Sequence, residues 1–377
     1  MAEINDKRIS SLRGQDKEYN ELYRKWRQDR TNKFGYYVSG VHDEHTYRDG
    51  KGFAGEYPEA DERETLELAT TLLMKVLIVY TLIEFAFKLL FSDHPFPPLL
   101  GVILYREGFT SDHDPLHIAV SMLTNILSRL LPFVYLLVKL KLPIQLAMPL
   151  KISNMPLFRC SVPIAMLTFG IIYTCDKIYS VFIPASGGMR PLFPWDGRFT
   201  VKDVPELMLF AVIIPILSEV VHRGVFMQMF RQFGDGFALF MSSIISALLA
   251  TEDSFMACFV YSLMIGYCTL RTGSVITAVI MRVIITGLYF TLDVVTGDNL
   301  DGMAGIAVSL TVLFCLGIGM IMVMRFVSNS RNRISLPLHH LYLTDTKKVM
   351  MVVSNPTFIA WITLFVVSTM WSVTFGR

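Results

Sequence analysis

The chain has 377 residues, of which 53% are hydrophobic, with a mean hydropathy of +0.47 and a formal net charge of +2 at pH 7. Several apolar runs reach the length of about 20 residues that a helix needs to cross about 30 Å of hydrocarbon. This composition excludes an ordinary water-soluble domain. No basic stripe of the kind that nucleic-acid binding needs is visible, so no nucleic-acid partner is expected.

Residues 1–66 are polar and charged, carry no visible cleavable signal peptide, and are expected to form a cytoplasmic N-terminal extension. An amphipathic helix is predicted within it, because large apolar side chains recur at i, i+3, i+4 and i+7: Tyr19, Leu22, Tyr23 and Trp26. This face either packs on the protein's own membrane domain or at the lipid surface, or it binds a partner protein. The run from His42 to His45 offers metal-ligand residue types, but we expect a solvated turn there.

Residues 67–377 are predicted to form an all-α transmembrane domain, because a backbone in lipid must satisfy its own hydrogen bonds. The two shortest runs are separated only by residues 251–253, so they form either a tight hairpin or one broken unit. In chain order the nine predicted spans are 67–91, 115–140, 161–182, 204–230, 237–251, 254–271, 274–292, 304–327 and 356–375.

The connections between these spans differ in charge. Residues 141–158 alternate apolar residues with prolines and single lysines, which predicts an interfacial segment that is not a further span. Residues 183–202 are expected to form an external loop, and 331–355 a basic loop facing headgroups. By the positive-inside rule the N-terminus is cytoplasmic and the C-terminus lies on the opposite side. The expected location is a bacterial cell membrane.

A few polar side chains interrupt the first three spans. Glu84 with Lys88, Asn125 with Arg129, and the neighbours Asp176 and Lys177 place polar or charged groups inside or near spans. They would suit a transport path, but hydrogen bonding between helices explains them at lower energetic cost. The five cysteines are isolated and without metal-type pairs, so we interpret them as small buried apolar residues.

The fourth span carries the densest set of charged residues in the apolar part of the chain. Residues 214–226 read Ile-Pro-Ile-Leu-Ser-Glu-Val-Val-His-Arg-Gly-Val-Phe, with Glu219, His222 and Arg223 between apolar side chains. Charge at this depth is costly, so such residues face protein or water and mark a functional site by default.

This segment resembles the first motif of the CPBP/Abi family of intramembrane proteases, the CAAX-processing type II proteases, which reads Glu-Glu-x-x-x-Arg-Gly. The resemblance extends over about residues 203–292 and includes a second run, 261–274, that ends in Arg-Thr-Gly-Ser. It implies a CPBP-like core of four to five helices, surrounded by the flanking spans.

The resemblance also implies where the family's catalytic residues would fall. In the family a glutamate activates water, while a Phe-x-x-x-His and a His-x-x-x-Asn motif help to bind and polarise the substrate carbonyl. Glu219, Arg223 and Gly224 match the first motif, but the other positions are replaced: Ser218 stands at the catalytic glutamate, Ser246 at the phenylalanine, Ala250 and Arg282 at the two histidines, and Thr286 at the asparagine. No catalytic residue, cofactor or metal is therefore expected.

Two residual chemistries remain open at this site. Ser218 and His222 lie four residues apart on one helix and so are able to meet as a nucleophile and its base. Glu219 is the other candidate base, although Arg223 at i+4 would lower its basicity. We also predict a structural clamp, in which Glu219 bridges Arg223 and Arg282, because a permanent cation in the membrane core needs a counter-charge.

The sequence therefore favours a non-catalytic CPBP-like membrane protein, or pseudoprotease. It would bind or scaffold a membrane protein or a lipidated partner through the former active-site cavity, or act as a subunit of a membrane complex. The alternative is a CPBP-type endopeptidase with an unconventional site. A transporter or channel subunit is the third possibility.

Overall fold

The computed structural model of the protein describes residues 17–29, 31–36, 47–48, 52–53, 58–91, 115–182, 208–249, 255–296, 302–328 and 342–375. Their helices are α2 (Lys17–Gln28), α3 (Pro58–Phe91), α5 (Pro115–Leu140), α6 (Ile144–Ala147), α7 (Met155–Phe182), α9 (Ile214–Glu219), α10 (Met227–Arg231), α11 (Asp235–Leu249), α12 (Phe255–Thr272), α13 (Val275–Thr296), α14 (Met303–Ser328), α15 (Asp345–Val353) and α16 (Pro356–Phe375). Two π-helical segments, η3 (Leu209–Ile213) and η4 (Val220–Phe226), join α9 and α10 into one continuous helical stretch. The short strands β1 (Tyr47–Arg48) and β2 (Gly52–Phe53) pair antiparallel.

Each of the nine predicted spans coincides with one of these helices or with the stretch from η3 to α10. Within the described residues, five helical stretches are long and apolar enough to cross a membrane, or six when α15 and α16, which meet at 61°, are taken as one broken span. The described parts of α11 and α13 are apolar but shorter. The all-α, multi-pass fold is confirmed, and the number nine stays a prediction.

The first span shows why hydropathy misplaces helix boundaries. α3 begins at Pro58, nine residues before the predicted start, with Glu59 and Asp61 in its first turn. Proline suits the first helical position, and acidic side chains interact favourably with the positive end of the helix dipole. Apolar composition marks only the part of the helix that lies in lipid, so a prediction from hydropathy places the charged first turns in the N-terminal extension.

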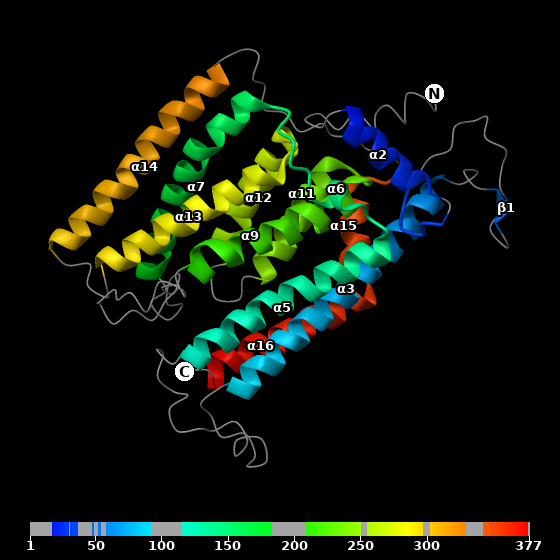
Figure 1. The fold of residues 1–377 in the computed structure, drawn as a ribbon, viewed down its shortest axis with the longest axis horizontal. Coiled ribbons are helices and arrows are strands. Elements are labelled where there is room, and N and C mark those ends of the chain that lie inside the picture. The colour runs from blue at the N-terminus through cyan, green and yellow to red at the C-terminus, as the bar shows by residue number, and fades with distance from the viewer. Residues whose placement is uncertain are drawn as a thin grey trace.

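The long helices run in roughly the same direction and form two groups (Figure 1). α3 packs against α5 and α16 in one group, and α7 packs against α12, α13 and α14 in the other. The stretch from η3 to α10 contacts both groups, with α9 against α5 on one side and α13 on the other. α11 packs against α10 and α12 as a separate helix, so the pair 237–251 and 254–271 forms two neighbouring helices.

Segments from distant parts of the sequence meet at the end of the bundle where α2 lies, which we call the α2 end (Figure 1). Gln232, in the turn after α10, exchanges hydrogen bonds with the backbone of Phe34 and Tyr36. The backbone N–H of Val275, at the start of α13, donates to Pro149 in the segment after α5. These loops lie at one end of the bundle, as the alternation of the predicted spans requires.

The apolar face of α2 packs against the membrane domain. Tyr19 donates a hydrogen bond to Gln228 Oε1 (2.8 Å), Tyr23 donates to the carbonyl of Gln228 (2.8 Å), and Trp26 Nε1 donates to the carbonyl of Leu140 (2.9 Å). Burial raises the pKa of Tyr19 to about 12, so its phenol keeps the proton that it donates. Leu22 is partly buried beside them. The structure thus shows the first of the two alternatives for this face, and the partner-binding role predicted for it would require α2 to leave this position.

The segment between α5 and α7 does not form a further span. It contains the one-turn helix α6, followed by residues 148–154 without helix. Its backbone is bonded to the Arg-Thr-Gly-Ser turn: Ser153 N–H donates to the carbonyl of Thr272 (2.9 Å), and Ser274 Oγ donates to the carbonyl of Leu150 (3.0 Å). Hydrogen bonds of this kind hold an otherwise irregular segment in a fixed position.

A buried ion pair joins α15 to the first turns of α3. Lys348 Nζ lies 3.2 Å from Glu62 Oε1, and both side chains are fully buried. Lys348 also donates to the backbone carbonyl of Phe233, while Glu62 Oε2 accepts from the backbone N–H groups of Tyr342 and Leu343. This pair therefore fixes α15, α3 and the turn after α10 relative to one another.

We expect Lys348→Ala to lower the free energy of unfolding by about 3–5 kcal/mol, because it leaves the Glu62 carboxylate buried without its counter-charge. Lys347→Ala is the matched control: Lys347 pairs with Glu59 at 3.5 Å, but both side chains are exposed. The loss there should stay within about 1 kcal/mol. Denaturant unfolding of the purified protein in detergent measures both, and equal losses would contradict a structural role for the buried pair.

Candidate functional site

The helix that carries the first motif is not regular. η3 ends at Ile213, two residues before Pro215, which has no amide hydrogen to donate to the preceding turn. η4 contains His222, Arg223 and Gly224, and the backbone N–H of Met227 bonds to the carbonyl of His222, five residues back. π-helical turns inside α-helices occur frequently at functional sites. The wider turns change which residues of this helix face α11 and α12.

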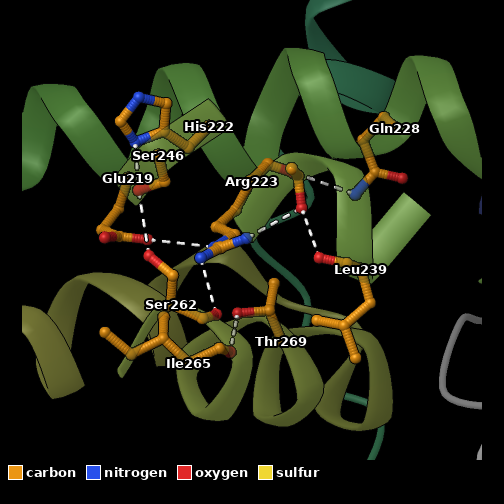
Figure 2. A network of polar contacts seen from close by, with 10 residues as sticks. Glu219, His222, Arg223, Gln228, Leu239, Ser246, Ser262, Ile265 and Thr269 are labelled. Carbon is orange, nitrogen blue, oxygen red and sulfur yellow. Dashed lines mark hydrogen bonds and ion pairs between the residues drawn. The ribbon is translucent and has the colours of Figure 1, made fainter. Parts of the chain in front are cut away.

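Arg223 is the centre of a buried polar network (Figure 2). Its Nη1 donates to Ser242 Oγ on α11 (2.9 Å), its Nη2 donates to the carbonyl of Ser262 on α12 (2.7 Å), and its Nε lies 3.4 Å from Glu219 Oε2. The side chains of Arg223 and Glu219 are 0% and 2% exposed. The guanidinium thus joins three helices, and the predicted Glu219–Arg223 contact is present.

The network continues from Arg223 to α2. The side-chain amide of Gln228 donates to the carbonyl of Arg223 (3.2 Å), and its Oε1 accepts from Tyr19 and from Arg231 Nη1. Arg231 Nε also lies 3.1 Å from Asp235 Oδ1 in a second buried ion pair. One chain of polar contacts therefore runs from the first-motif arginine to the N-terminal helix.

His222 meets a serine of another helix. Its Nδ1 lies 3.2 Å from Ser246 Oγ on α11, and Ser246 Oγ accepts a hydrogen bond from Ser262 Oγ on α12 (3.0 Å), as Figure 2 shows. The contact between His222 and Ser218 that their spacing allows is not formed; Ser218 Oγ instead accepts from Arg129 Nε of α5 (3.3 Å). The wide turn of η4 accompanies this arrangement, and the sequence spacing gave no sign of it.

Arg282 lies against an aromatic ring. Its guanidinium carbon is 4.3 Å from the centre of the Tyr261 ring on α12, a cation–π contact that offsets part of the cost of burying the charge. The other predicted partner of Arg282 is Glu219. The ion pair between these two side chains, the second half of the predicted clamp, stays a prediction. Thr286, one turn further along α13, is buried.

The remaining candidate residues lie outside the described part of the chain or make contacts elsewhere. Ala250 and the run His42 to His45 lie outside the described residues, as do the side chains of Lys88, Asn125, Asp176 and Lys177. Glu84 accepts a hydrogen bond from Tyr80 on its own helix. Within the described part of the chain, no group of three or more His, Cys, Asp or Glu side chains is placed to hold a metal ion.

Two glycines allow the close packing around Arg223. A Cβ on Gly224 would lie 2.3 Å from the backbone carbonyl oxygen of Ala147 in α6. A Cβ on Gly266 would lie 2.5 Å from Leu239 and 3.0 Å from the Arg223 guanidinium. The glycine of the first motif thus brings the segment after α5 against the motif helix, and Gly266 lets α12 approach the arginine.

These features define a multi-pass helical membrane protein with a buried polar network at the meeting point of the motif helix, α11 and α12. The resemblance that the motifs indicate is confirmed for this region: residues 200–288 match the family model described as Type II CAAX prenyl endopeptidase Rce1-like. The predicted limits of the resemblance, about 203–292, agree with the matched residues. No curated protein and no solved structure matches the chain.

We expect Gly224→Ala to lower the free energy of unfolding by about 1–3 kcal/mol, because the added methyl group would overlap the backbone of Ala147 and push the segment after α5 away. Gly287→Ala on α13 is the control, since a Cβ there would meet nothing within 4 Å. Thermal unfolding in detergent compares the two. A stability of Gly224→Ala equal to that of Gly287→Ala would show that the close approach does not matter.

The clamp is tested by a double-mutant cycle of Glu219→Gln and Arg282→Ala. If the two charges stabilise each other, the double variant should lose less stability than the sum of the single variants, by at least about 1 kcal/mol. Glu219→Gln combined with Lys347→Ala serves as the control cycle, because Lys347 is exposed and pairs with Glu59. Additive losses for Glu219 and Arg282 would remove the clamp while leaving the Glu219–Arg223 pair intact.

Proposed function

We propose that this chain is a non-catalytic relative of the CAAX-type intramembrane proteases, which binds a membrane protein or a lipidated segment beside the motif helix without cutting it. The family model that matches residues 200–288 describes a prenyl endopeptidase, and this supports lipidated protein segments as the class of partner. Scaffolding within a membrane complex is the same function with a larger partner.

The observation that carries this proposal is how the side chains at the former catalytic positions are used. Ser218, in place of the water-activating glutamate, accepts a hydrogen bond from Arg129. Arg282, in place of a histidine, lies against Tyr261 and keeps its charge near neutral pH. Glu219 is the carboxylate of the motif, and it is held by the buried Arg223. Peptide hydrolysis needs a positioned proton acceptor and a proton donor, and these groups are poor candidates for either role.

The basic loops also support an orientation. We place the α2 end in the cytoplasm, because Lys139, Lys141, Lys151 and Arg271 lie in or beside the connections that meet there. A lipidated cytoplasmic protein would then reach the motif helix from the leaflet at the α2 end. We include in this proposal that the chain binds such a partner and that it lies in a bacterial cell membrane.

A farnesylated peptide with a benzophenone group tests both halves of the proposal. Reconstituted protein should be cross-linked to the intact peptide on illumination, while release of the C-terminal tripeptide stays at least about a hundredfold below that of an active relative, the loss expected without a general base. Ser218→Trp should reduce capture, because the indole would fill the space beside the partly exposed Ser218. Leu313→Trp, on an exposed face of α14, is the control.

The results separate the two halves. Capture that does not change in Ser218→Trp, or that is absent in the unaltered protein, would exclude binding of a lipidated segment beside the motif helix. Efficient tripeptide release that disappears in Glu219→Gln would contradict the non-catalytic half.

A second candidate function, an endopeptidase with a serine nucleophile, is favoured by the 3.2 Å contact between Ser246 Oγ and His222 Nδ1. In that reaction the Ser246 proton would pass to His222 Nδ1 as Oγ bonds to the substrate carbonyl carbon. The proton would then go to the leaving amine, and water would release the acyl group. Within the described residues no side chain is hydrogen-bonded to the second ring nitrogen of His222, so the orienting group of a triad is missing there. Cleavage that is abolished by Ser246→Ala, but not by the buried neighbour Ser243→Ala, would favour this candidate.

A further inference from the structure

The segment that joins α5 to α7 carries an unusual excess of positive charge. No aspartate or glutamate occurs between residues 115 and 175. Four basic side chains of this region are exposed around the connection at the α2 end: Lys139, Lys141, Lys151 and Arg159. We call residues 139–159 the basic interfacial segment. Because α5 ends and α7 begins within it, this segment must lie at the surface of the bilayer.

Large apolar side chains are exposed between these basic residues. Ile144 is 67% exposed, Leu150 59% and Met155 45%. In water such a set would be unfavourable, but at a bilayer surface the apolar groups enter the acyl region while the ammonium and guanidinium groups stay among the headgroups. The alternation of the two kinds of side chain suits a lipid surface better than a protein partner of acidic character, which would leave the apolar side chains in water.

The basic interfacial segment is held rigidly by the core of the protein. Pro149, Leu150 and Ser153 are all hydrogen-bonded to the turn at 272–275. Ala147 lies against Gly224 of the motif helix, and Lys141 Nζ donates to Thr31 Oγ1 at 2.8 Å, next to α2. The exposed side chains therefore stand on a preformed backbone, so a ligand bound there would need to order little of the chain.

We propose that the basic interfacial segment is a binding site for the headgroups of anionic phospholipids in the adjacent leaflet. Lys139, Lys151 and Arg159 supply the positive charge, and Ile144, Leu150 and Met155 contact the acyl chains of the bound lipids. Each basic side chain near a membrane surface strengthens the attraction of anionic lipid about fivefold. This site is separate from the polar network around Arg223 and goes beyond the proposed function.

The test is retention of lipid by the purified full-length protein in native mass spectrometry. Protein in detergent is mixed with phosphatidylglycerol or with phosphatidylcholine of the same acyl chains. We expect phosphatidylglycerol to be retained preferentially, and the preference to fall as sodium chloride is raised from about 50 to about 500 mM, because salt screens the headgroup charge. The triple variant Lys139→Gln, Lys151→Gln and Arg159→Gln should lose most of the preference.

The matched control is Lys17→Gln, Arg24→Gln and Lys25→Gln, which removes three exposed basic side chains from α2. The preference should persist there, because Glu18 and Glu21 already offset the charge of that helix. Equal retention of the two lipids by the unaltered protein, or an unchanged preference in the first triple variant, would overturn the proposal. Displacement of phosphatidylglycerol by an equal concentration of inorganic phosphate would also overturn it, because the site would then bind a free anion. The salt dependence of the unaltered protein tests the proposal even if the variant fails to fold.

Discussion

The guanidinium of Arg223 is the constraint on which the arrangement of this core depends. A permanent cation in the interior of a membrane domain must be surrounded by acceptors, and here these come from Glu219 on its own helix, Ser242 on α11 and Ser262 on α12. The three helices are therefore held at a distance and rotation that direct their polar atoms to one point. Gly266 on α12 follows from the same requirement, since a side chain there would occupy the space of the guanidinium.

Two of the residues that this chain shares with the CAAX-type motif have structural roles. Arg223 has a structural role, because its contacts are to protein atoms, and Gly224 has one because it admits the backbone of α6. In the alignment that we propose with the family's motifs, Ser218 and Arg282 stand at catalytic positions, and their side chains make contacts within the protein: Ser218 bonds to Arg129, and Arg282 contacts an aromatic ring. These contacts are compatible with the binding function that we propose, since binding needs the shape of the site but no general base.

The sequence predicted the parts of the structure that depend on periodicity and composition. Apolar run length located the helices, and the i+4 spacing of Glu219 and Arg223 predicted their contact. Prediction from the sequence failed where the geometry depends on long-range packing. The spacing of Ser218 and His222 suggested a pair, but η4 widens the helix at His222, and Ser246 and Arg129, 24 and 89 residues away, hold the two side chains apart. Ser242, Ser262 and Gln228 were missed because single polar residues in apolar runs give no periodic signal. Their common property, a polar atom within an otherwise apolar helix, would have been the one usable indication.

The same physics links the N-terminal helix to the site. Burial of a glutamine side chain is favourable only if its donors and acceptors are satisfied, and Gln228 achieves this by bonding both to the carbonyl of Arg223 and to Tyr19 of α2. Without α2, Gln228 Oε1 would keep its hydrogen bond from Arg231 but lose the one from Tyr19. The backbone carbonyl of Gln228, which accepts from Tyr23, would lose that donor. The position of α2 and the position of the motif helix are therefore energetically coupled through one side chain. A partner that competes for the apolar face of α2 would act on the core through the same residue, because the cost of releasing α2 falls on the hydrogen bonds of Gln228.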